Sequence, residues 1–200
     1  MFWGKNVNKN IDNSKLLVIA LIVLVVITFY NINSRLSGVD NKKNNSFSVQ
    51  VLDLAKTVNG ISINKNVVLI TEEGDKVTIG DIINGENKIM LKYNKLNCSV
   101  CNDEEIKNIK KEFSKTNTEK IILISKYDEL KELVIFKRVN NLHIPVYNLP
   151  EGMFLSPIDK KNYTYYFTTD SSLIIKDCFI PIQNYPELSK YYLQSQLLKS

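Results

Sequence analysis

Residue types that build metal and catalytic sites are scarce in this sequence. It has 200 residues but only three cysteines and a single histidine, His143. A structural zinc site on Cys98 and Cys101 needs two further ligands, and without a second CxxC or an HxxxH pattern only Cys178 and His143 offer a thiolate or an imidazole. No residues near His143 form a triad with it. We therefore expect no metal, and we interpret His143 as structural. Cys178 is by default a core thiol without an assigned role, and an intermolecular disulfide or a second resolving role are its alternatives.

Concentrated charge of one sign is also absent. The 26 basic residues are interspersed with 21 acidic ones, and no basic stripe is interleaved with aromatics, so we do not expect nucleic acid as a partner. The chain is 44% hydrophobic, as ordinary globular proteins are, and it is long enough for one domain with some extra chain. Composition alone indicates neither an activity nor an oligomeric state.

The sequence has one long uncharged run, close to its N-terminus. Residues 16–32 contain no charge, and at ~1.5 Å per helical residue they span about 25 Å, near the lower limit for crossing a bilayer. A cleaved signal peptide is the alternative, because three lysines precede a short apolar core. However, no small-x-small cleavage site follows, and Phe29 and Tyr30 suit a membrane interface. We expect an uncleaved transmembrane signal anchor.

The anchor divides the chain into four parts. Three basic residues precede it and three follow soon after, so charge alone leaves its orientation open. The simplest topology has a cytoplasmic tail at 1–15, the span at 16–32, a polar linker at 33–46 and an exported domain at 47–200. We expect that domain to be extracytoplasmic, facing the periplasm or the cell exterior.

Strand and helix patterns alternate through the predicted domain. Residues 67–83 suggest two short strands joined at Glu73 and Gly74, then one helical turn. Further strands are expected at 88–94, 120–126 and 142–149, helices after Cys101, at 127–141 and at 185–199, and a hairpin formed by 163–170 and 172–181. This order predicts an α/β fold, a mixed sheet with helices on both faces.

The two closely spaced cysteines stand where a strand gives way to a helix. Cys98 and Cys101 are followed by apolar residues at helical spacing, Ile106, Ile109 and Phe113. Residues at i and i+3 of a helix have Cβ atoms ~5–6 Å apart, so a small adjustment permits a disulfide. The helix N-terminus stabilises a thiolate, which favours Cys98 as the nucleophile and Cys101 as the resolving thiol. Zinc binding and two unreactive core thiols are the alternatives.

The stretch 69–101 resembles the opening of a membrane-anchored thioredoxin-like protein of the redoxin (TlpA) type. Such domains have a strand-turn-strand, a short helix, a central strand and then CxxC on the first long helix. The matching residues are Glu73, Gly74, Asp75, Val77, Ile79, Asp81 and Ile82. The resemblance covers roughly residues 60–198 and implies a thioredoxin-like fold and a redox-active disulfide.

Two positions depart from that family. Asn97 stands where the family has tryptophan before the first cysteine, and Thr164, beside Tyr163, stands where it has the cis-proline that faces the disulfide. The resemblance thus assigns Tyr163 and Thr164 to the substrate-side backbone of the site. The peroxiredoxin pattern PxxxTxxC is absent, because Leu91 and Lys95 hold the proline and threonine places.

The expected function is thiol-disulfide exchange with protein thiols or disulfides, with no organic cofactor. The alternative is a thioredoxin-like binding module in which Cys98 and Cys101 form a structural disulfide. Residues 149–162 form a long connection containing Met153, Phe154 and Leu155, which would suit a recognition loop, although these side chains could equally cover the core.

Overall fold

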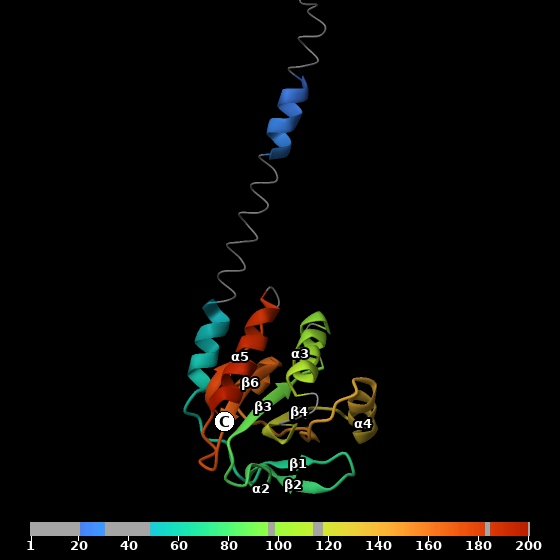
Figure 1. The fold of residues 1–200 in the computed structure, drawn as a ribbon, viewed down its shortest axis with the longest axis vertical. Coiled ribbons are helices and arrows are strands. Elements are labelled where there is room, and N and C mark those ends of the chain that lie inside the picture. Colours follow the sequence, from blue (N-terminus) through green and yellow to red (C-terminus); the bar gives the residue numbers. More distant parts are fainter. Residues whose placement is uncertain (1–20, 31–48, 96–98, 114–117, 183–184, 200) are drawn as a thin grey trace, which may run out of the picture. The chain divides into compact units, whose positions relative to one another are not determined.

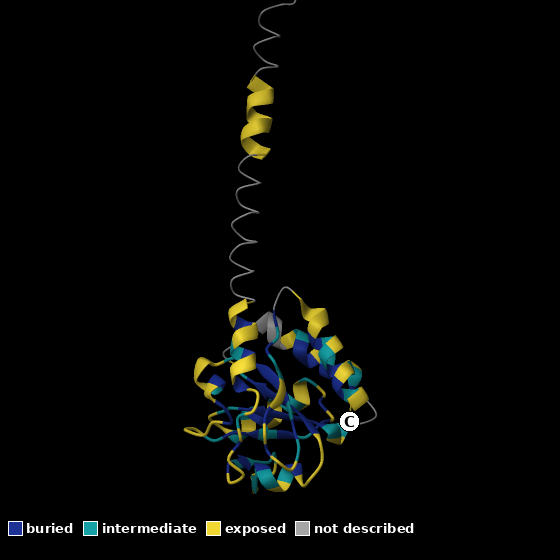
Figure 2. Cartoon of the chain, turned by 90° about the vertical axis from the view of Figure 1, so that its left-hand side faces the viewer, coloured by how far each residue is buried: buried dark blue, intermediate teal, exposed yellow. Residues whose placement is uncertain are grey.

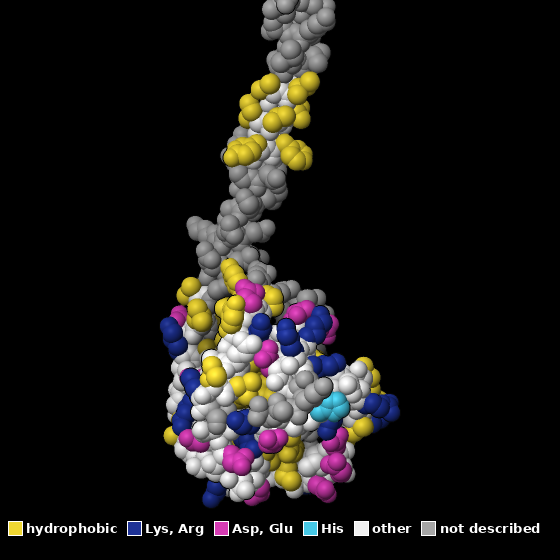
Figure 3. Space-filling model, viewed as in Figure 1, with side chains coloured by type: hydrophobic (Ala, Val, Ile, Leu, Met, Phe, Trp, Pro, Cys, Tyr) yellow, Lys and Arg dark blue, Asp and Glu magenta, His cyan; other side chains and the backbone are white. Residues whose placement is uncertain are grey.

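The computed structural model describes residues 21–30, 49–95, 99–113, 118–182 and 185–199, with 99–102 described for their backbone alone. The chain contains two compact units, Met1–Phe47 and Ser48–Ser200. In the first unit, residues 21–30 form a helix whose large apolar side chains are all exposed (Figure 3). No helix within the described ranges has both the length and the apolar character needed to cross a membrane. Residues 16–20, 31 and 32 of the predicted anchor lie outside those ranges.

The second unit contains the predicted elements in the predicted order (Figure 1). A helix at 49–58 comes first. The other elements are β1 (Val68–Ile70), β2 (Lys76–Thr78), α2 (Ile79–Ile83), β3 (Lys88–Tyr93), α3 (Ser99–Glu112), the 3-10 helix η1 (Thr118–Lys120), β4 (Ile121–Ser125), α4 (Leu130–Val139), β5 (Val146–Asn148), the 3-10 helix η2 (Pro157–Lys161), β6 (Tyr165–Thr169), β7 (Lys176–Phe179) and α5 (Pro186–Lys199).

These strands form one mixed sheet in the order β2-β1-β5-β4-β3-β6-β7. The three strands at its centre, β3, β4 and β5, are parallel, and the outer strands pair antiparallel to their neighbours. Every residue of β3 and β4 is buried. The continuous apolar run of β4 is typical of a strand covered on both faces, and the structure confirms that prediction.

Helices cover both faces of this sheet, which confirms the predicted α/β architecture (Figure 2). Because side chains alternate along a strand, Met90 of β3 packs on one face while Ile89 and Leu91 pack on the other. Helix 49–58 and α2 contribute to the core with Met90. The helices α3, α4 and α5 contribute to the core with Ile89 and Leu91.

Two local signals explain the first hairpin and the short helix after it. Gly74 has a φ of +95°, a conformation that glycine adopts without strain, and it lies in the β1–β2 turn. Thr78 caps α2 by accepting a hydrogen bond from the Asp81 backbone NH, and the Asp81 carboxylate bonds back to Thr78. Both features fall inside the stretch that carries the family resemblance.

Helix 49–58 was not predicted from the sequence. It buries Val51, Ala55 and Val58 against the sheet. The chain that follows it pairs with the arm of the last hairpin, because the Gly60 NH donates to the Ile175 carbonyl at 2.8 Å. The predicted domain therefore starts with a helix whose position depends on residues more than a hundred positions later.

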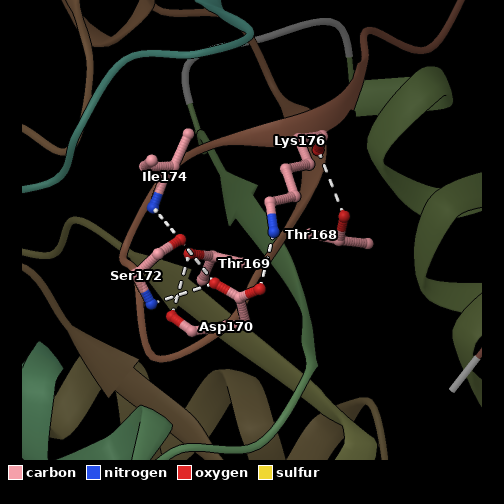
Figure 4. Close-up of polar contacts among 6 residues, drawn as sticks. All are labelled: Thr168, Thr169, Asp170, Ser172, Ile174 and Lys176. Carbon is pink, nitrogen blue, oxygen red and sulfur yellow. Dashed lines mark hydrogen bonds and ion pairs between the residues drawn. The ribbon is translucent and has the colours of Figure 1, made fainter.

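The β6–β7 hairpin turns at Asp170, as predicted (Figure 4). The Asp170 carboxylate accepts hydrogen bonds from the Ser172 backbone NH at 2.9 Å and from the Lys176 ammonium at 2.6 Å. The Ser172 hydroxyl in turn accepts from the Ile174 NH at 3.3 Å. A short aspartate side chain thus organises the turn through its own neighbours.

Candidate functional site

The backbone of Cys101 lies shortly after the end of the central strand. Strand β3 ends at Tyr93, and α3 begins at Ser99, so the backbone of Cys101 lies in the first turn of α3. Cys98 lies outside the described residues. The first acidic residue of α3 is Asp103, which follows the first turn. The helix N-terminus therefore lies at Cys101 without an acidic side chain in its first turn.

Thr164 contacts the segment that leads to the cysteines. It is buried, and its hydroxyl accepts a hydrogen bond from the Asn94 backbone NH at 3.1 Å. The Asn94 side chain donates to the Asn162 side-chain oxygen at 3.2 Å. Tyr163 packs against the core, and no peptide bond within the described ranges is cis. Residues 70 positions apart are thus joined beside the end of β3.

A cavity of about 230 Å³ opens at this end of the sheet. It lies past the ends of β3 and β4, where the segment 149–162 approaches them. Its lining residues are Lys92, Asn94, Lys95, Lys126, Asp128, Leu149, Met153, Phe154, Asp159 and Asn162. Met153 and Phe154 are exposed, whereas Leu155 is buried in the core, so the predicted recognition loop has one part that covers the core and one that faces solvent.

Lys92 is the least expected residue of this cavity, because it is a buried lysine in the central strand. Burial lowers its pKa, the nearby Asp159 carboxylate raises it, and Lys126 lowers it further. Asp159 completes the capping box of η2, whose N-cap is Ser156, and its carboxylate accepts hydrogen bonds from the Leu155 NH at 2.6 Å and the Tyr165 hydroxyl at 2.9 Å. The cavity therefore combines a buried cation with a structurally committed carboxylate.

A second buried charge fixes α3 in place. Glu105 of α3 accepts hydrogen bonds from the Tyr166 hydroxyl at 2.8 Å and from the Ser189 hydroxyl of α5 at 2.7 Å. All three residues are buried. Burial raises the pKa of Glu105 to about 7, although both hydrogen bonds oppose the shift. This network joins the helix of Cys101 to β6 and α5.

The remaining cysteine and the histidine take no part in this arrangement. Cys178 is a free, partly buried thiol on β7, and burial raises its pKa to about 12, so it stays protonated at neutral pH. His143 is exposed and precedes the amino end of β5, the end of the parallel strands opposite to Asn94. Within the described residues, no three His, Cys, Asp or Glu side chains cluster as metal ligands.

The sequence contained signals for the residues it left unassigned. Lys92 interrupts an apolar strand, and Ser156-Pro157 followed by Asp159 is a capping pattern. Glu105 is one of three consecutive acidic residues near the start of the predicted helix, and its burial depends on α5.

Comparison with known proteins gives likeness to solved structures alone. Neither a scan against family models nor a search of curated proteins found a match. The chain is similar to a thiol:disulfide interchange protein from Bacteroides sp., with 12% identity and a TM-score of 0.47 over 66% of this chain and 89% of the other. It is also similar to peroxiredoxin Q from Xanthomonas campestris, with 14% identity and a TM-score of 0.47 over 68% of this chain and 97% of the other. For peroxidoxin BcpB from Mycobacterium tuberculosis, the identity is 12% and the TM-score is 0.47, over 68% of this chain and 96% of the other. At these identities and TM-scores, the likeness assigns no activity to this chain.

Proposed function

We propose that the chain is a membrane-anchored thiol-disulfide oxidoreductase of the thioredoxin-like redoxin type, with an extracytoplasmic catalytic domain. The observation that supports this most strongly is the position of Cys101 in the first turn of α3, directly after the central strand. The elements that the family resemblance implies surround it in the implied order. Thr164, at the cis-proline position, contacts the segment before the cysteines.

The proposed exchange uses only the two thiols of this chain. The Cys98 thiolate attacks one sulfur of a substrate disulfide, forms a mixed disulfide and releases the other substrate sulfur as a thiolate. Cys101, deprotonated in turn, attacks the Cys98 sulfur and frees the second substrate thiol, so the substrate is reduced by two electrons and Cys98 and Cys101 are oxidised to a disulfide. A partner dithiol reverses these steps to regenerate the enzyme, and the same chemistry run backwards oxidises a substrate.

The redox proposal is tested with the full-length chain kept in solution by a non-ionic detergent. After equilibration in glutathione buffers of graded potential, mass spectrometry should show a Cys98–Cys101 disulfide that forms and opens reversibly. Cys101→Ser should trap a mixed disulfide on Cys98, while Cys178→Ser, a matched change on β7, should behave as the parent. A pair that never cycles, or thiols that retain zinc instead, would overturn the proposal.

The proposed anchor is a separate step with its own test. Residues 21–30 form a helix of exposed apolar side chains inside the uncharged run 16–32. In cells, the protein should remain in the membrane fraction after alkaline carbonate extraction, and externally added protease should reach the domain once the outer barrier is opened. Release by carbonate, or protection of the domain, would contradict the anchor or its orientation.

A binding module is the second candidate, and the exposed side chains of Met153 and Phe154 favour it. Partner capture separates the two candidates. A module with a structural disulfide should lose partner binding in Phe154→Ser and tolerate Cys98→Ser, whereas an oxidoreductase should lose turnover in Cys98→Ser.

A further inference from the structure

Strand β3 carries two buried lysines whose surroundings differ. Lys88 near its start is 8% exposed, and Lys92 near its end is 4% exposed. Both lie on the face of Met90, because each is two positions from it along the strand. The partners of Lys88 can therefore be compared directly with those of Lys92 on the same strand.

Lys88 has the partners that a buried ammonium group requires. Its Nζ donates to the Glu86 carboxylate at 2.5 Å and to the Glu119 backbone carbonyl at 3.0 Å. A buried charge of this kind is held by a counterion and hydrogen bonds. We assign Lys88 a structural role.

Lys92 lacks an equivalent set of partners. Among the described residues, its Nζ makes one long contact, 3.4 Å to the Tyr93 carbonyl. No carboxylate of the described residues lies within ion-pair distance of it. Asp159 is near enough to influence it, but that carboxylate already accepts bonds from Leu155, Ser156 and Tyr165. An ammonium group has three donors, so Lys92 retains capacity for an anion.

The rest of the cavity indicates the kind of anion. Lys95 and Lys126 line the same cavity as Lys92, so its lysines outnumber its two carboxylates, Asp128 and Asp159. Lys95 contacts Asp128 and Glu132, and Lys126 contacts Glu151. Met153 and Phe154, 40% and 45% exposed, supply an apolar wall. A cavity of about 230 Å³ is large enough for one or two side chains and too small for a folded element.

We propose that this cavity binds an acidic side chain of the substrate polypeptide, whose carboxylate pairs with Lys92 while a neighbouring apolar residue packs on Met153 and Phe154. The inference rests on the proposed function, because it names the substrate class of the same site. Three peptide units join Lys95 to Cys98, so their Cα atoms are at most about 11 Å apart in any conformation. A substrate segment only a few residues long thus reaches from the cavity to the nucleophile.

The test is a series of short peptides, each with one cysteine activated as a mixed disulfide with an aromatic thiol. Glutamate is placed, beside leucine, at each position from three before to three after the cysteine, and each peptide has a glutamine twin. Exchange rates are measured with the reduced full-length chain, with Lys92→Met and with Lys88→Met as the matched control on the same strand. Circular dichroism and thermal melting confirm that all three proteins are folded.

At the best position, the glutamate peptide should react about tenfold faster than its glutamine twin, the usual value of one charge-assisted hydrogen bond. Lys92→Met should abolish that preference, and Lys88→Met should keep it. Equal rates for the twins at every position, or a preference that survives Lys92→Met, would overturn the inference.

A failure of the redox proposal is recognised separately. If no peptide exchanges with any form of the protein, the same peptides with serine for cysteine are titrated by calorimetry. Tighter binding of the glutamate peptide to the parent than to Lys92→Met would support the cavity as an acidic-segment site without redox turnover. Equal binding would reject it.

Discussion

The two ends of the sheet hold an aspartate and a lysine in opposite ways. At the hairpin end, Asp170 and Lys176 are in direct contact at 2.6 Å and fix a turn at the surface (Figure 4). At the other end, Asp159 and Lys92 line one cavity without an ion pair between them. In the first arrangement the two charges pair with each other, whereas in the second the buried Lys92 faces a cavity. That contrast separates charges used for folding from charges available to a ligand.

The strand register shows that these are opposite ends of the same ladder. Lys92 pairs with Tyr165, and Lys88 pairs with Thr169. The Tyr165 hydroxyl donates a hydrogen bond to Asp159, and Thr169 directly precedes Asp170. Lys88, which pairs with Glu86, thus lies at the end of the sheet where the charges are paired with each other.

The largest expected effect tests this contrast with cysteines. Cys98→Ser should abolish disulfide exchange, because the attacking sulfur is lost. Cys178→Ser, on the hairpin arm, should leave exchange unchanged, because burial raises the pKa of that thiol to about 12. Turnover of a fluorogenic disulfide peptide measures both. Activity that survives Cys98→Ser but falls with Cys178→Ser would mean that Cys178, not Cys98, is the attacking thiol.

Asp159→Ala should be the most destabilising change of a carboxylate discussed here. It removes the Asp159 half of the η2 capping box and the carboxylate that accepts from the buried Tyr165 hydroxyl, and it leaves Lys92 without its nearby negative charge. We expect a loss of about 2–3 kcal/mol in the free energy of unfolding, measured by urea denaturation. A loss no greater than that of Asp170→Ala would mean that Asp159 is not the structural carboxylate of this end.

Glu105 extends the comparison to a carboxyl group buried under α5. Its pKa is raised to about 7, so between pH 4.5 and 7 the folded state holds a proton that the unfolded state has released. Stability should therefore fall as the pH rises through this window, by at most about 3 kcal/mol. Glu105→Gln should flatten that part of the profile, measured by urea denaturation from pH 4 to 8.

A second carboxylate between the same helices provides the control. Glu112 of α3 accepts hydrogen bonds from Gln194 of α5, and Glu112→Gln should keep the slope of the parent protein. If both variants keep the slope, Glu105 is not the group responsible for the pH dependence.

Local patterns predicted the strands and helices from β1 onward but not helix 49–58, and the burial of charged residues depended on distant contacts. The apolar run of β4 and the spacing of Ile106, Ile109 and Phe113 identify a strand and a helix face by themselves. Lys92 is buried because the segment 149–162 covers the end of β3, and Glu105 because Ser189 meets it from α5. These contacts join residues far apart in the sequence, so no local hydrophobic pattern predicts them. The family resemblance assigned Thr164 to the site, but no sequence pattern indicated its hydrogen bond with Asn94, which lies 70 positions away.

The smallest expected effect belongs to Asp170. The Lys176 ammonium and the Ser172 donors hold its pKa well below the usual range. Its contribution to stability should be present above the ordinary aspartate pKa of 3.8 and should be lost as the pH falls below that value. Asp170→Ala should lower the urea midpoint only slightly at pH 6, because an exposed pair is screened by water. The effect should be smaller at pH 2, where part of this contribution is already lost. Lys176→Met should reproduce part of this change, since Ser172 still donates to the carboxylate. An equal effect at both pH values would show that the turn is held by its backbone geometry rather than by its charge.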